Sequence, residues 1–379
     1  MPIAVSGFEH LAGQMLDLYE EAEQTMLGLI AGHLSNDTGS RQWAARKQAE
    51  FFSVRMELSG VLRGLRSGRM NLSDDFIRTA YSASANAFVA EASKFTDEMR
   101  ITALSSNSPK VASILSELSN TFNAEDRVIL RRCNDVYADI IGRTSAKALT
   151  GAINVRQAVQ EELDAFANLG ISGFVDKNGR TWEMATYAEM ATLTAIEKAT
   201  LYGYIDSMVM NGQDLAIISK HAGSCPLCVA WEDVVISVSG STPGYPTLDD
   251  ATDAGCFHPR CLHNLSVYRP GITPGGRMQP RSVEQPTQSY SVRQRQRALE
   301  RQVRKWKRRM AVAIDPQNER VAYAHVRMYQ QSLRDLIKGY GENGDKLLRK
   351  YWREGGTVRL SKEAKKMRPV QLKKYAGRR

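Results

Sequence analysis

The sequence predicts an α+β protein that is predominantly α-helical, and three observations lead to this class. Apolar residues recur every three or four positions through residues 1–170, short β-prone runs occur within residues 171–270, and basic residues concentrate in residues 291–379. We therefore expect a helical bundle domain, a small α+β module with a Cys/His cluster, a Pro-, Gly-, Gln- and Ser-rich linker over residues 271–290, and a basic helical tail.

The bundle domain (residues 1–170) is expected to hold about five antiparallel helices. From Leu11 to Leu29, apolar side chains fall at spacings of three and four, as one buried helix face requires. Residues 41–65 repeat this pattern. We expect Ser73 to cap a further helix, because two aspartates follow it, and Pro109 to lie in the first turn of the next helix.

The α+β module (residues 171–270) combines a predicted hairpin, a long helix and short strands. The hairpin centres on Asn178-Gly179, and the helix after it runs from about Met184 to Met210. Thr247 is expected to cap a short helix. Strands are predicted over residues 214–219, 234–240 and 264–268.

Two Cys/His motifs in the module offer five candidate ligands for a zinc site. Cys225 and Cys228 form a C-x-x-C, and after 29 residues His258, Cys261 and His263 form an H-x-x-C-x-H. Structural zinc takes four ligands, and it prefers thiolates and imidazoles. The same residues also suit a tight turn of reduced, buried cysteines, in which both histidines are hydrogen-bonded to the backbone.

Catalytic interpretations of these motifs are less favoured. A redox C-x-x-C begins a helix in a βαβ unit, whereas the residues after Cys228 are predicted to be extended. A catalytic zinc needs an open coordination position and a general base such as Glu232. The sequence contains no Walker A lysine motif, G-x-G-x-x-G, H-E-x-x-H or G-x-S-x-G. We therefore expect no enzyme, and zinc as the one cofactor.

The charge distribution points to a polyanionic or acidic partner. Residues 291–379 hold 26 of the 51 Lys+Arg and 8 of the 41 Asp+Glu, a net charge of +18, which leaves −8 on the rest. We expect docking on an acidic protein surface, with secondary, non-specific DNA contact, since no base-reading motif is present. The basic residues predicted to make these contacts are Arg301, Arg304, Lys305, Lys307, Arg308 and Arg309.

The sequence predicts neither a membrane span nor a secretory signal. No run approaches 18 apolar residues, and the first ten residues lack a basic stretch followed by an apolar one. Five cysteines in 379 residues fit a reducing compartment better than a disulfide scaffold.

Residues 173–271 resemble the phage minor capsid protein 2 family of tailed bacteriophages. The resemblance rests on five blocks in order: D-x-x-G-R-x-W, T-Y-A-E-M, C-P-L-C-x-x-W-E, Y-P-T-L and H-P-x-C-x-H. It implies a structural virion protein, made in the host cytoplasm and held inside the head near the portal. Portal, capsid or scaffold proteins would be its partners, and head morphogenesis, DNA packaging or ejection its role.

The chain departs from the family pattern within the Cys/His motifs. Family members often have Arg at Cys225 and His at Cys228, and Arg at Leu262. The resemblance therefore favours Cys228, Cys261 and His263 as ligands, with His258 next. Two other hypotheses remain: a zinc-dependent nucleic-acid-processing enzyme, and a zinc-containing DNA-binding adaptor.

Overall fold

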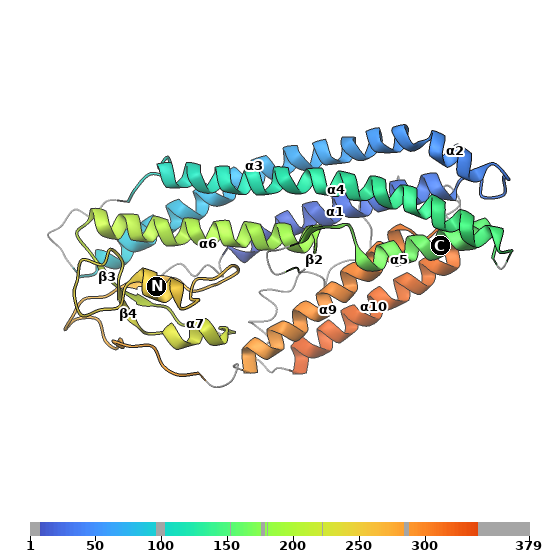
Figure 1. Ribbon diagram of the computed structural model, residues 1–379. Coiled ribbons are helices and arrows are strands. Elements are labelled where there is room, and N and C mark those ends of the chain that lie inside the picture. Colours follow the sequence, from blue (N-terminus) through green and yellow to red (C-terminus); the bar gives the residue numbers. More distant parts are fainter. Residues whose placement is uncertain are drawn as a thin grey trace. The chain divides into compact units, whose positions relative to one another are not determined.

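The computed structural model describes most of the chain (Figure 1). The described residues are 8–95, 103–151, 153–175, 179, 181–221, 223–283 and 288–339. Within these residues the chain forms ten helices and five short strands, which confirms the predominantly helical α+β class. None of the described helices combines the length and the apolar character that a membrane span requires.

Two compact units divide the chain, each assembled from three segments. Unit 1 comprises Met1–Gln14, Met70–Thr121 and Glu189–Arg295. Unit 2 comprises Met15–Arg69, Phe122–Ala188 and Gln296–Arg379. Several long helices therefore contribute residues to both units.

Unit 2 is almost entirely helical. Its helices are drawn from α1 (Glu9–Ser35), α2 (Trp43–Ala49), α3 (Phe51–Ala92), α4 (Pro109–Leu149), α5 (Val155–Leu169), α9 (Gln288–Ala311) and α10 (Pro316–Gly339). Helices α9 and α10 pack side by side through Val303, Val326 and Leu333 (Figure 1). The pairing of β1 (Ser172–Val175) with β2 (Thr181–Glu183) confirms the predicted hairpin, although Asn178 lies outside the described residues.

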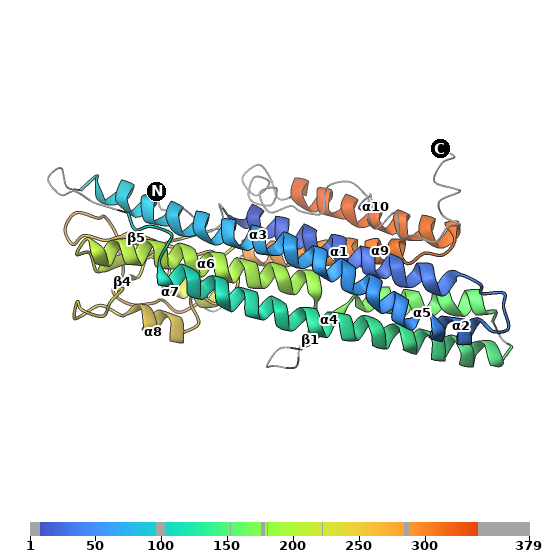
Figure 2. The same cartoon turned by 90° about the horizontal axis from the view of Figure 1, so that it is seen from above.

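Helix α3 is one continuous helix of 42 residues, so the helix start predicted at Ser73 is wrong (Figure 2). The apolar periodicity passes through this point, and Phe76 is buried on the same face. Asp74 accepts a hydrogen bond from Arg78, one turn further on, at 2.9 Å. Asp74 therefore stabilises the helix surface rather than a helix N-terminus. Pro109 begins α4, as predicted.

Unit 2 buries charged side chains in pairs that connect its helices. Arg69 of α3 is 2% exposed, and it donates hydrogen bonds to Asp126 of α4 at 2.8 Å and to the Tyr19 hydroxyl of α1 at 3.1 Å. Arg308 of α9 is 1% exposed, and it donates to Glu183 at 2.9 Å. Such pairs are stable only when each buried charge keeps its partner.

Unit 1 contains a three-stranded antiparallel sheet with the strand order β4-β3-β5. The strands are β3 (Leu215–Ile218), β4 (Val235–Ser237) and β5 (Leu265–Val267), which confirms the three predicted strands in shorter form. The predicted long helix is α6 (Met184–Met210). Thr247 caps the short helix α8 (Leu248–Asp253), as predicted, by accepting a hydrogen bond from Asp250 N at 3.0 Å.

The core of unit 1 joins α6 to the sheet and to the Cys/His motifs. Tyr204 and Met208 of α6 pack in one apolar cluster with Ile218 of β3, and the same cluster includes Cys228 and Cys261. The hydroxyl of Tyr204 also accepts a hydrogen bond from the backbone N–H of Val267 at 2.8 Å. The two cysteines are therefore fixed by a core rather than by a loop alone.

Candidate metal centre

The first Cys/His motif lies at the N-terminus of a short helix, α7 (Pro226–Trp231). Cys225 is the N-cap, and its Sγ accepts a hydrogen bond from Cys228 N at 3.5 Å. Pro226 occupies the first helical turn, where its missing N–H costs no hydrogen bond. The extended conformation predicted after Cys228 is therefore wrong for residues 229–231, which are helical, whereas residues 235–237 do form a strand. The surrounding sheet is antiparallel rather than a βαβ unit, so the helix alone does not restore the redox interpretation.

The second motif is a tight loop between α8 and β5. Phe257 and Arg260 have φ values of 55° and 69°, so the backbone is left-handed at both positions. Cys261 N donates to the His258 carbonyl at 2.8 Å, which closes the turn between them. His263 N in turn donates to Cys261 Sγ at 3.4 Å.

The structure brings all five predicted ligands into two overlapping triads. The ligand atoms of Cys225, Cys228 and His258 lie within 4.8 Å of one another, and so do those of Cys228, Cys261 and His263. Cys228 belongs to both triads. Its Sγ lies 3.6 Å from Cys261 Sγ, close to the separation of about 3.8 Å expected for two thiolates on one tetrahedral zinc.

Both histidines have the supporting contacts typical of metal-ligating imidazoles. His258 Nε2 lies 3.0 Å from Cys225 Sγ, while its Nδ1 lies 2.9 Å from the Pro259 carbonyl oxygen. His263 Nδ1 lies 3.3 Å from Cys261 Sγ, while its Nε2 lies 3.3 Å from Glu232 Oε1. In each ring, one nitrogen faces a thiol and the other an oxygen that fixes the ring.

The electrostatics of the cluster favour an anionic sulfur at one position, because hydrogen bonds with neighbouring thiols, together with burial, raise the pKa of Cys228 and Cys261. Hydrogen bonds from the Cys228 thiol and the His258 imidazole lower the pKa of Cys225 to about 3. Burial lowers the pKa of His263, but its contacts with Cys261 and Glu232 outweigh this and raise the pKa to about 9. The Cys225 thiolate thus lies within reach of a cation at this point, while the Glu232 carboxylate holds His263 from the other side.

The second triad is fully buried, whereas Cys225 and His258 of the first triad are half-buried. Cys228, Cys261 and His263 are 1%, 3% and 2% exposed. All five cysteines of the chain are free thiols, so no disulfide competes for these sulfurs. The residues present therefore fit a metal ion, and the burial of the second triad suits a structural site better than a catalytic one, which keeps a position open.

Two residues that support the cluster were not found by sequence reasoning. Cys256 is buried, and it packs in the same apolar cluster as Cys228. Ser224 donates to Glu232 Oε1 at 2.5 Å. Cys256 could have been noticed because it precedes His258 by two residues, whereas no spacing rule marks Ser224. Glu232, considered as a general base, instead holds His263.

The basic residues predicted to contact DNA or a partner fall into two groups: four have acidic partners within unit 2, and two are accessible to solvent. Arg304 and Lys307 each lie 3.7 Å from Glu20, and Arg309 lies 2.5 Å from Asp164. Arg308 is buried against Glu183 and Glu23. These four residues therefore have acidic partners within unit 2. Arg301 is exposed and Lys305 is half-buried, so contact with other molecules stays a prediction for them.

Comparison with known proteins gives one family and two relatives. The profile of the family described as phage minor capsid protein 2 matches residues 3–338. A structural protein of Lactococcus phage LL-H is 31% identical over 239 residues, which is 59% of this chain and 62% of that protein. A structural protein of Lactococcus phage mv4 is 36% identical over 118 residues, which is 30% of this chain and 92% of that protein.

The match to the phage LL-H protein is partial: it spans 62% of that relative's length. No solved structure matches the chain.

Proposed function

This chain belongs to the phage minor capsid protein 2 family, and we propose that it is a structural protein of the phage virion that acts inside the head near the portal. It would be made in the host cytoplasm and join the head by contact with portal, capsid or scaffold proteins. Its role would be in head morphogenesis and in DNA packaging or ejection. The family match over residues 3–338 is the observation that carries this proposal.

The Cys/His cluster would serve this role as a structural zinc site. Because Cys228 belongs to both triads, a single zinc ion would use Cys228 with three of Cys225, His258, Cys261 and His263. The short strands of unit 1 have three or four residues each, so the sheet alone gives the module little hydrogen-bonded structure. A metal that joins α7 to the loop before β5 would hold the module rigid for assembly contacts.

Contact with DNA would be secondary to these protein contacts. Arg301 and Lys305 are accessible on α9, and residues 340–379, which lie outside the described residues, carry further Lys and Arg. Such contact would be non-specific and electrostatic, and it would weaken steeply with added salt.

Purified virions test the assignment directly. Mass spectrometry of phage particles that encode this chain is expected to find it in the head at low copy, and disruption of its gene should reduce the yield of filled heads. Intact, fully infectious virions without this chain would contradict the proposal.

Metal analysis of the recombinant protein, followed by incubation with DNA, separates the structural from the enzymatic interpretation. We expect stoichiometric zinc and unchanged DNA. DNA cleavage that is lost on substitution of Cys228 would instead support a zinc-dependent nucleic-acid-processing enzyme.

A further inference from the structure

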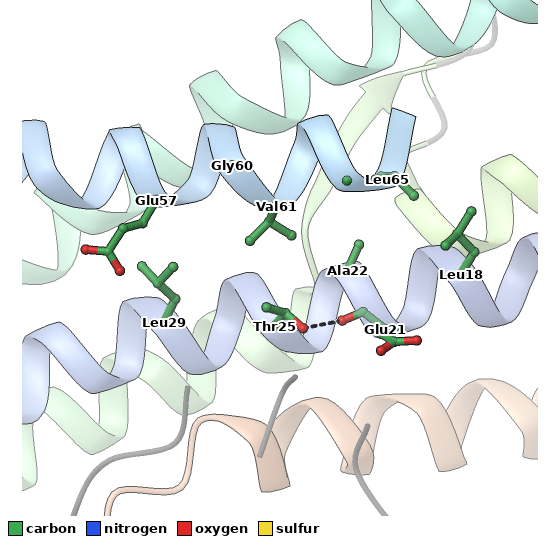
Figure 3. Close-up of a pocket in the computed structure, with 10 residues that line it drawn as sticks. Leu18, Glu21, Ala22, Thr25, Leu29, Glu57, Gly60, Val61 and Leu65 are labelled. Atoms are coloured by element: carbon green, nitrogen blue, oxygen red, sulfur yellow. Dashed lines mark hydrogen bonds between the residues drawn. The ribbon is translucent and has the colours of Figure 1, made fainter. Parts of the chain in front are cut away.

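Thiol groups are concentrated in unit 1 of this chain. Four of the five cysteines lie within residues 225–261, and the fifth, Cys133, is buried in unit 2. The apolar groove between α1 and α3 of unit 2 is lined by residues without a thiol or an imidazole (Figure 3). Two thiols of the same unit can therefore meet only in the Cys/His cluster of unit 1.

The sulfur atoms of Cys228 and Cys261 are already in contact. Their Sγ atoms lie 3.6 Å apart, so a shift of about 1.6 Å would bring them to the length of a disulfide bond. Both side chains are buried in one apolar cluster, which would shield such a bond from small thiols in solution. Cys228 belongs to α7 and Cys261 to the loop before β5, 33 residues further along the chain. A bond between them would therefore close a long loop and connect two elements of the module.

Cys225 gives this buried pair a route to solvent. It is half-buried, it caps α7, and its Sγ accepts a hydrogen bond from Cys228 N at 3.5 Å. Its Sγ also lies within 4.8 Å of Cys228 Sγ. Neither triad contains both Cys225 and Cys261, so Cys228 stands between them. The three sulfur atoms therefore lead from the half-exposed edge of the cluster to its buried interior.

We propose that Cys228 and Cys261 form a disulfide bond in place of the metal, by exchange with a low-molecular-weight disulfide that reacts first at Cys225. The setting rests on the proposed function: the chain is made in a reducing host cytoplasm, whereas the released virion meets an oxidising medium. A disulfide removes two thiolates from the ligand set, so metal and disulfide exclude each other. Each of them joins α7 to the loop before β5, so the module stays crosslinked in both settings.

The exchange has three steps, in which two protein thiols are oxidised and the small disulfide is reduced to two thiols. The Cys225 thiolate attacks one sulfur of the small disulfide, which expels the first small thiolate and leaves a mixed disulfide. Cys228 then attacks the Cys225 sulfur, and its proton leaves with the second small thiol. Finally Cys261 attacks the Cys228 sulfur, which restores the Cys225 thiolate, and the Cys261 proton passes to the first small thiolate.

Oxidised glutathione, added to the full recombinant chain in its reduced form, tests the proposal. Thiols are blocked by alkylation at intervals, and tryptic peptides are mapped without reduction. Trypsin cuts after Arg260, so Cys261 lies on the peptide of residues 261–269, and the other three cysteines of unit 1 lie on the peptide of residues 221–260. We expect these two peptides to become linked, with fragmentation placing the bond at Cys228.

Zinc binding by the two forms gives a second readout. The reduced chain should bind one equivalent of zinc, and the linked chain should lose this binding. A linked chain that binds zinc as tightly as the reduced chain would overturn the proposal. So would a final product in which Cys261 is still a free thiol, including one with a bond between Cys225 and Cys228.

Three variants test the pairing and the route. Cys256→Ser should leave the link intact, whereas Cys225→Ser should slow its formation at least about tenfold. Cys133→Ser is the matched control, because Cys133 is a buried thiol of unit 2, and it should leave the rate unchanged. A link that is lost with Cys256, or that forms equally fast without Cys225, would overturn the proposal. Unchanged helical circular dichroism would show that the variants fold.

Purified virions separate this proposal from the proposed function. In virions that contain the chain, the two peptides should be linked, and in infected cells before lysis they should be free. A chain whose Cys261 stays a free thiol in virions would overturn the proposal. Absence of the chain from virions would contradict the proposed function alone, because the recombinant chain tests the exchange independently.

Discussion

The Cys/His cluster of unit 1 and the helical core of unit 2 bury polar groups in different ways. In the cluster, thiols and imidazoles from two short motifs converge on one point, where a single cation could satisfy them together. In unit 2, buried arginines have counter-charges on other elements, as Arg69 has in Asp126 and Arg308 has in Glu183. A metal ion would complete the first arrangement, whereas the chain itself supplies both partners of these ion pairs.

This difference has a consequence for stability. A site built for a cation is stabilised by the free energy of metal binding, and it weakens when the metal is removed. A buried ion pair is indifferent to metal, but it is destabilised strongly when one partner is lost, because the other charge stays buried. Metal removal and charge removal should therefore act on different units.

The largest expected effect is that of metal removal from unit 1. Structural zinc contributes roughly 10 kcal/mol to the folding of small zinc peptides, so chelation or Cys228→Ser should cost several kcal/mol here. Limited proteolysis with and without a chelator should show cleavage within residues 214–268 first. The control is Cys133→Ser, since Cys133 is a buried thiol of unit 2, far in sequence from the cluster. Equal protection with and without chelator would contradict a structural metal.

The next effect is the loss of a buried charge from unit 2. Arg69→Met should lower the free energy of unfolding by about 3–5 kcal/mol, because Asp126 is left buried without its main partner. Arg66 also contacts Asp126 but its side chain is 52% exposed, so Arg66→Met should cost at most about 1 kcal/mol.

Urea unfolding measures both of these Arg variants. The double variant Arg69→Met with Asp126→Leu should recover most of the stability, because neither charge then remains buried. Equal losses for Arg66→Met and Arg69→Met would show that burial does not decide the effect.

The Cys/His cluster could be predicted from the sequence because each of its two motifs consists of residues that are close together in the chain. Each motif spans a few residues, and thiol and imidazole side chains at such spacings indicate a metal site even when the fold is not known. The three-stranded sheet could be predicted for a similar reason, since its strands lie between turn residues. What the sequence could not show is which triad each ligand joins, because that depends on how the loop before β5 meets α7.

The charge pairs of unit 2 could not be predicted in this way. Arg308 meets Glu23 and Glu183, which lie more than a hundred residues away in the chain, so no spacing connects them. The sequence predicts that Arg308 lies on a basic helix face that contacts DNA or a partner. In the structure it is buried beside Gly170, where a Cβ would come within 3.0 Å of both Arg308 and Glu23.

A smaller effect on the free energy of unfolding is expected from substitution of Asp214. This residue represents a third arrangement, in which hydrogen bonds rather than a metal ion or a counter-charge satisfy a carboxylate. Its carboxylate accepts hydrogen bonds from Ser237 and Thr242, and from the backbone N–H and hydroxyl of Ser239. Burial raises the pKa of Asp214, but these hydrogen bonds together hold it well below its usual value. Hydroxyl groups thus stabilise this carboxylate, in the way that a basic side chain stabilises Asp126 in unit 2.

Acid titration tests the contribution of Asp214. Because its pKa is lower in the folded state, its stabilisation is complete above the unfolded pKa of about 3.9 and is lost as the pH falls through the folded pKa. Asp214→Asn should cost about 1 kcal/mol near pH 7, and the difference from the wild type should shrink as the pH falls below about 4. Urea unfolding of both proteins over this range measures it, and a difference that does not change with pH would contradict the assignment.

The smallest effect on stability is expected at Arg301, the exposed member of the six basic residues predicted to contact DNA or a partner. Arg301→Ala should change the free energy of unfolding by less than about 0.5 kcal/mol. If Arg301 contacts a phosphate, the substitution should lower the slope of log binding constant against log salt by about 0.9. Arg308→Met gives the opposite pattern, a large loss of stability, since its charge is already paired with Glu23 and Glu183. DNA binding measured by fluorescence anisotropy over a salt series, beside urea unfolding, therefore separates the basic residues that hold unit 2 together from those available to other molecules.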